Sequence, residues 1–137
     1  MYGAQRLSTQ DFQAATIRMM TPLERYGLVA LGGAAGALVR YAAAMQFGAR
    51  ASTTFAVNIT GSFLIGVLAA SVVDPRWRLL AGAGFLGGYT TFSTWQLEAL
   101  LSVHAEDWRG AAVNLFGSVA AGFAAVVLGY AAGFRLR

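Results

Sequence analysis

The residues of this sequence that are best able to do chemistry are neutral hydrogen-bond donors. A spacing of four residues puts Thr54, Asn58 and Ser62 on one face of a predicted helix. Amides and hydroxyls donate hydrogen bonds without carrying charge. A path lined by such donors suits a small, strongly hydrated anion, because the donors replace water and no fixed cation traps the ion. The spacing is equally compatible with a structural role for Asn58, as a hydrogen bond that ties two membrane helices together.

A second group of donors follows the glycine pair Gly87–Gly88, in the middle of a long apolar segment, 77–103. Its hydroxyl side chains are those of Thr90, Thr91, Ser93 and Thr94. Glycine costs a helix about 1 kcal/mol relative to alanine, and Ser and Thr tend to bond to nearby backbone. We therefore expect two half-helices, 77–86 and 93–103, joined by non-helical backbone. In a membrane such backbone must be buried in protein or face a polar cavity, so the break is a candidate ion site.

Two aromatic and two charged residues lie near these donors. Phe92 and Trp95 are three residues apart at the break. Their ring edges carry partial positive charge that can face an anion, although ordinary packing explains the pair equally well. Arg40 either attracts anions to a pore entrance or extends its side chain to lipid headgroups. Glu98 is the only acidic residue well inside an apolar segment, which makes it a functional candidate unless it is a solvated carboxylate at the membrane surface.

The elements that must position these residues are membrane-spanning helices. The chain has 137 residues, of which 57% are hydrophobic and 12% are charged, whereas soluble domains contain roughly 25% charged residues. Apolar segments long enough to cross a bilayer lie at 26–47, 53–73, 77–103 and 109–134. The sequence therefore predicts an all-α membrane protein with four transmembrane helices within residues 25–137, the third broken at its middle. Residues 1–24 form a polar N-terminal extension that we expect to be disordered or to lie on the membrane surface.

The composition also excludes several classes of function. One histidine, no cysteine and no plausible set of Ser, His and Asp residues leave nothing from which to build a catalytic site or a thiolate metal site, so no enzyme activity is expected. The net charge of +4 comes from arginine alone, and no basic soluble face is evident, so no nucleic-acid partner is expected. In a membrane protein these arginines contact headgroups and control topology.

Several motifs, in order along the chain, resemble the small bacterial fluoride channels of the Fluc (CrcB) type. The stretch 84–95, GFLGGYTTFSTW, is similar to their GF-x-GG-x-TTFS-x-F signature. The stretch 57–66, VNITGSFLIG, is similar to their second-helix motif VN-x-x-G-x-F-x-x-G. The glycine-rich 32–37 followed by Arg40–Tyr41 resembles the first-helix motif, and 114–118, NLFGS, resembles the start of the fourth helix.

The resemblance covers about residues 26–133 and implies a passive, fluoride-selective channel of the bacterial inner membrane that lowers cytoplasmic fluoride. It implies an antiparallel homodimer in membrane lipid with two fluoride pores and a central structural sodium ion (Na+) that is not transported. Carried over position by position, the sodium ligands are the backbone carbonyls of Gly87 and Thr90. The fluoride pore falls on Asn58, Phe92, Trp95, Ser118 and Thr91, and the pore ends fall on Arg40 and Glu98.

The sequence departs from the family pattern in three ways. Trp95 stands where the signature has phenylalanine, residues 1–24 extend beyond the usual start, and the arginines are unevenly distributed. The arginines on the predicted terminal side are Arg18, Arg25, Arg76, Arg78, Arg135 and Arg137, and those of the opposite loops are Arg50 and Arg109, with Arg40 nearby. A chain with this bias prefers its termini in the cytoplasm. Either the topology is dual despite the bias, or the subunit forms a heterodimer with an oppositely oriented relative.

Two other functions remain compatible with the residues. A coupled four-span exporter of small solutes would need a carboxylate inside the membrane, a role open to Glu98, although the first predicted span has no acidic residue. A non-transporting assembly subunit would explain the small residues along the helices. It would not explain a glycine-broken helix rich in hydroxyl groups.

Overall fold

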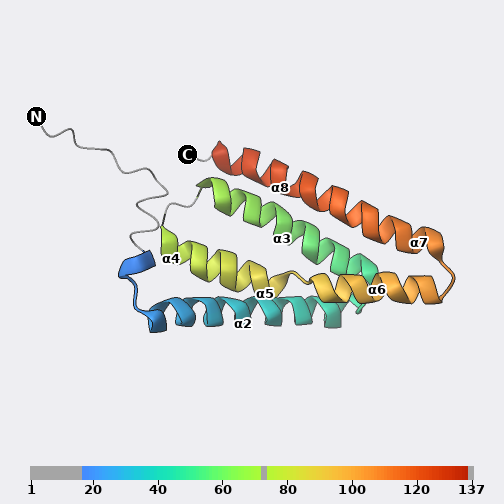
Figure 1. The fold of residues 1–137 in the computed structure, drawn as a ribbon, viewed down its shortest axis with the longest axis horizontal. Coiled ribbons are helices and arrows are strands. Elements are labelled where there is room, and N and C mark those ends of the chain that lie inside the picture. Colours follow the sequence, from blue (N-terminus) through green and yellow to red (C-terminus); the bar gives the residue numbers. More distant parts are fainter. Residues whose placement is uncertain (1–16, 72–73, 136–137) are drawn as a thin grey trace, which may run out of the picture.

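The structure is a computed structural model that describes residues 17–71 and 74–135. Every regular element within these residues is helical, and no strand occurs among them, which confirms the all-α fold class (Figure 1). Of the predicted N-terminal extension, residues 1–16 lie outside the described part, as do residues 72–73 and 136–137.

The first long helix, α2 (Pro22–Phe47), begins four residues earlier than the predicted span. Thr21 lies in extended backbone, and its side chain accepts a hydrogen bond from the backbone N–H of Glu24 at 3.2 Å. Proline at the first helical position has no N–H to leave unsatisfied and already has a helical φ. The last three residues of the predicted extension therefore belong to the helix. The helix ends at Phe47 and is followed by Gly48, whose φ of 89° favours glycine.

The other elements form three more helical segments that run side by side with α2 (Figure 1). Helix α3 spans Ala51–Ser71. Next come α4 (Pro75–Trp77), the π-helical η1 (Arg78–Leu86), α5 (Gly87–Tyr89) and α6 (Phe92–His104), which we call the broken segment. The last segment consists of α7 (Trp108–Ala112), the π-helical η2 (Val113–Gly117) and α8 (Ser118–Phe134). Helix α3 packs on α8, and α2 packs on η1 and α5.

Three helical stretches are long and apolar enough to cross a membrane within the described residues. They are Pro22–Phe47, Ala51–Ser71 and Trp108–Phe134. The broken segment contains no single helix of that length. The start of α2, the start of α4 and the end of α8 lie at one end of the bundle (Figure 1). The chain is therefore a helical membrane protein.

Small residues hold the helices together. A Cβ built on Gly32 or Gly36 of α2 would overlap the backbone of η1, and one built on Gly66 would overlap the backbone of α8. Large apolar side chains point outward instead, such as Leu31 (70% exposed) and Phe123 (72% exposed). Lipid is as apolar as a protein interior, so in a membrane close backbone packing replaces a core of large side chains.

Gly129→Ala should destabilise the protein by about 1–3 kcal/mol, because overpacking a close helix contact forces the backbones apart. A Cβ at Gly129 of α8 would overlap the carbonyl oxygen of Phe63 on α3. Thermal unfolding in detergent measures the effect, with Gly27→Ala as the matched control, since a Cβ at Gly27 meets no atom within 4 Å. Equal melting temperatures for the two variants would contradict the close α3–α8 contact.

Candidate functional site

Two extended residues interrupt the broken segment. Thr90 (φ −80°, ψ 156°) and Thr91 (φ −144°, ψ 122°) separate Tyr89, the last residue of α5, from Phe92, the first of α6. The first half-helix was expected to end at residue 86. This bound was wrong by three residues, because Gly87–Tyr89 is helical. Gly87 has φ −64° and ψ −37°, so no unusual backbone conformation requires glycine there. Among the described residues beyond its chain neighbours and its own helical turn, the nearest atom to a Cβ at Gly87 is the carbonyl oxygen of Gly82, 4.0 Å away.

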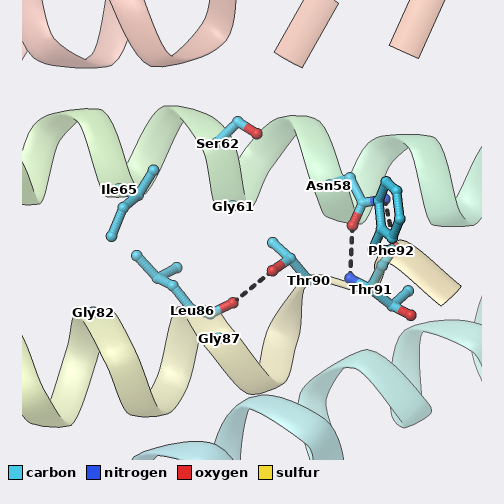
Figure 2. A pocket seen from close by; sticks show the side chains of 10 residues that line it. All are labelled: Asn58, Gly61, Ser62, Ile65, Gly82, Leu86, Gly87, Thr90, Thr91 and Phe92. Atoms are coloured by element: carbon cyan, nitrogen blue, oxygen red, sulfur yellow. Dashed lines mark hydrogen bonds between the residues drawn. The ribbon is translucent and has the colours of Figure 1, made fainter. Parts of the chain in front are cut away.

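Both polar atoms of the Asn58 side chain, on α3, form hydrogen bonds with the backbone of Thr91. Its Nδ2 donates to the carbonyl oxygen of Thr91 at 3.0 Å, and its Oδ1 accepts from the N–H of Thr91 at 2.9 Å (Figure 2). These two bonds satisfy backbone groups that the end of the helix releases. Asn58 therefore does tie two segments together, the structural role considered above. One amide hydrogen of Asn58 has no acceptor among the described residues and is free for a ligand.

Two backbone carbonyls near the interruption, those of Gly87 and Thr90, have no hydrogen-bond donor among the described residues. A helix would pair the carbonyl of Gly87 with the N–H of Thr91, but Asn58 takes that N–H. The preceding carbonyl, of Leu86, accepts from both the N–H and the hydroxyl of Thr90, at 3.0 and 2.9 Å. Within residues 17–71 and 74–135, no hydrogen bond reaches the carbonyl of Gly87 or that of Thr90. These neutral oxygens are the type of ligand that unwound membrane helices offer to Na+.

An open cavity of about 400 Å³ lies between α3 and the broken segment. Its lining brings together six of the residues singled out in the sequence: Asn58, Ser62, Gly87, Thr90, Thr91 and Phe92. Figure 2 shows the ring of Phe92 beside Asn58 at one end of this cavity, whereas the side chain of Ser62, one turn further along α3, points away from the broken segment. The polar atoms of the cavity are amides, hydroxyls and carbonyls, so the cavity carries no fixed charge.

Trp95 and Ser118 do not line this cavity, but both donate hydrogen bonds to Asn114. The rings of Phe92 and Trp95 are 5.1 Å apart at 44°, which is a tilted contact. The indole Nε1 of Trp95 donates to the backbone carbonyl of Asn114 at 3.1 Å. The hydroxyl of Ser118 donates to the side-chain Oδ1 of Asn114 at 3.2 Å. Phe92 remains 66% exposed, so most of its surface is not covered by any of the described residues.

Arg40 and Glu98 line a second cavity of about 290 Å³, together with Thr91. The Nε of Arg40 donates to the carbonyl of Gly88 at 3.1 Å, where positive charge suits the C-terminal end of α5. Arg40 therefore has a hydrogen-bond partner in the protein backbone. Oε1 of Glu98 accepts from the hydroxyl of Thr54 at 2.6 Å, and its Oε2 is buried without a partner among the described residues.

The sequence carried no signal for the contact between Arg40 and Gly88. A backbone carbonyl is present at every position, and these two residues are 48 apart in the chain. The sequence did contain a signal for Thr54, because its four-residue spacing from Asn58 predicts that both lie on one polar face. The spacing placed Thr54 on that face, but only the packing of α3 against α6 brings it to Glu98.

The comparisons with known proteins agree on one family. The family model described as "CrcB-like protein, Camphor Resistance (CrcB)" matches residues 27–130. A protein of Acidobacterium capsulatum, called fluoride-specific ion channel FluC, is 46% identical over 124 residues, which cover 82% of this chain and 98% of that protein. Fluoride-specific ion channel FluC 2 of Parasynechococcus marenigrum is 44% identical over 111 residues, covering 80% and 81%. The FluC of Solibacter usitatus is 42% identical over 116 residues, covering 77% and 94%.

Proposed function

Because this chain belongs to the CrcB-like family, whose similar members are named as ion channels rather than enzymes, we propose that it is a fluoride-selective passive channel. It lies in the inner membrane of a bacterium and lets fluoride leave the cytoplasm down its gradient. One observation within the chain carries the proposal. A cavity between α3 and the broken segment is lined by neutral polar groups, among them the amide of Asn58 with one free hydrogen, and by the ring of Phe92, without fixed charge.

Fluoride is small and strongly hydrated, so a channel must replace its water shell. The free amide hydrogen of Asn58 is a donor of the required type. The hydroxyl of Thr91, also in the lining, donates to Oγ1 of Thr94 at 3.0 Å, so it would have to rotate away from Thr94 to bind the ion. The ring edge of Phe92 adds partial positive charge. None of these groups is a cation, so the ion is coordinated without being trapped. Arg40, in the second cavity, attracts anions to the entrance, and Glu98 lies at the same end.

The channel is proposed to work as an antiparallel dimer of four-span subunits. The broken segment then crosses the membrane as the third span, with its free backbone groups buried in protein. Support comes from the exposed outer face of Phe92 and from the open side of the cavity, which a second chain would close. At the end of the bundle where α2 and α4 begin, Arg25 and Arg76 lie in the first turns of these helices and Arg78 begins η1, whereas Arg109 lies in α7. The partner is therefore either a second copy in opposite orientation or an oppositely oriented relative.

A structural sodium ion is proposed at the dimer centre. The carbonyls of Gly87 and Thr90 would hold it, because both lack donors within the described residues and both are neutral oxygens. Two copies of the chain would supply four such oxygens. The ion would offset the repulsion between these carbonyls and stabilise the dimer. No role in transport is assigned to it.

The sodium proposal predicts a stability that depends on Na+. Replacing Na+ by a large organic cation at constant ionic strength should lower the melting temperature of the purified dimer, because an ion bound only by the folded dimer stabilises it by mass action. Thermal unfolding in detergent, with size-exclusion chromatography to verify the dimer, measures this. A melting temperature that is the same in both cations, with the protein still dimeric, would contradict the ion site.

Anion flux from liposomes that contain the purified chain tests the function itself. A fluoride electrode should record fast fluoride efflux without a proton gradient, and a chloride electrode should record none. A coupled exporter using Glu98 would require the gradient, and the buried free oxygen of that carboxylate makes it the alternative worth testing. Flux from this chain alone identifies a homodimer, whereas flux that requires a second, related chain identifies a heterodimer.

A further inference from the structure

Trp95 makes a specific polar contact that a phenylalanine could not make. Its indole Nε1 lies 3.1 Å from the backbone carbonyl of Asn114, which links α6 to the π-helical turn η2. The same carbonyl also accepts the backbone N–H of Ser118 at the end of η2. A carbonyl oxygen has two lone pairs, so both donors are accommodated. The indole therefore fixes the position of the turn that carries Asn114.

In the side-chain amide of Asn114, the oxygen has a hydrogen-bond partner and the nitrogen has none among the described residues. Its Oδ1 accepts the hydroxyl of Ser118 at 3.2 Å. Its Nδ2 is buried, and both amide hydrogens lack an acceptor among the described residues. A buried donor without a partner costs free energy, and in a native protein such a group calls for an explanation. An anion that passes beside the amide would supply the missing acceptor.

The neighbours of Asn114 place it next to the proposed pathway. Trp95, which holds its carbonyl, is in ring contact with Phe92. Phe92 in turn lines the cavity that contains the amide of Asn58 (Figure 2). Contacts through the aromatic pair therefore connect Asn58 and Asn114, two asparagines whose side-chain amides each have at least one free hydrogen among the described residues.

We propose that Trp95 is a positioning residue of the anion pathway, and that the donors it positions are the free amide hydrogens of Asn114. The indole N–H does not bind the ion, because the Asn114 carbonyl already takes it. What faces the anion from Trp95 is only its ring edge, as with phenylalanine. This inference rests on the proposed function of fluoride conduction.

A double-mutant cycle on fluoride efflux from liposomes tests the inference. Trp95→Phe keeps an aromatic ring but removes the N–H, and should lower the flux about fivefold, the effect of one ordinary hydrogen bond. Asn114→Leu should lower it about tenfold or more, the effect of one hydrogen bond to a charged group. In the Asn114→Leu background, Trp95→Phe should then change the flux by less than about twofold. Trp108→Phe is the matched control, since Trp108 is 67% exposed at the start of α7, and it should conduct normally.

Each other outcome overturns the inference. Equal losses from Trp95→Phe in both backgrounds would mean that Trp95 acts by itself, through packing or its ring. Normal conduction by Asn114→Leu would mean that its amide is no donor. If Asn114→Leu does not assemble, Asn114→Asp keeps the acceptor for Ser118 and should also lower the flux about tenfold or more, and normal flux from it would equally refute the role. A wild-type protein without fluoride flux would refute the proposed function and this inference with it, whereas the variants refute the inference alone.

Discussion

The Asn58→Asp variant is expected to lose fluoride conduction by about a hundredfold or more, because a fixed negative charge a few ångströms from an anion in a weakly screening site costs several kcal/mol. The structure adds a second effect to this repulsion. Nδ2 of Asn58 donates to the carbonyl of Thr91 at 3.0 Å, and a carboxylate would put two acceptors there. The substitution should therefore also loosen the interruption after α5.

Fluoride efflux from liposomes and thermal unfolding of the same preparation separate these two effects. Gln46→Glu is the matched control, because it makes the same amide-to-acid change at an exposed position near the end of α2. It should conduct like the wild type. An Asn58→Asp protein that is dimeric and conducts within about twofold of the wild type would remove Asn58 from the anion pathway.

The Phe92→Ile variant should lose fluoride flux by about tenfold or more while the fold is retained. Isoleucine keeps an apolar side chain but removes the aromatic ring that lines the cavity and its contact with Trp95 at 5.1 Å. Phe92 is 66% exposed within the chain, so the substitution removes little packing inside the subunit.

Phe47→Ile provides the control for Phe92. Phe47 is similarly exposed (63%) but lies at the last position of α2, outside the cavity of Asn58. Its variant should conduct normally in the same liposome assay. Normal flux from Phe92→Ile would show that the aromatic pair only packs, the alternative that its sequence spacing left open.

Helical periodicity was sufficient for much of this protein's architecture. The low charge content and the long apolar stretches predicted a helical membrane protein, and the cores of α2, α3 and α8 lie where the hydropathy placed them. The ends of the helices were predicted less accurately. Helix α2 begins before its apolar part, because Thr21 caps it and Pro22 suits its first position. The four-residue spacing of Thr54 and Asn58 also predicted their common face, because helix geometry depends only on distance along the chain.

The partners of these residues depended on tertiary structure. Glycine's low propensity predicted the loss of helix at Gly87, but the packed structure keeps that residue helical and interrupts the helix at Thr90 and Thr91 instead. The amide of Asn58 supplies the bonds that Thr91 loses there.

By itself, the sequence determined the membrane class, the order of the apolar segments and the set of neutral donors, since these follow from composition and local periodicity. Only the tertiary structure decided that Asn58 clamps Thr91, that Arg40 binds the carbonyl of Gly88 and that Trp95 reaches Asn114. The physical reason is that each of these bonds includes a backbone group. Every residue has a backbone carbonyl and nearly every one an N–H, so only packing between distant segments selects which of them is used.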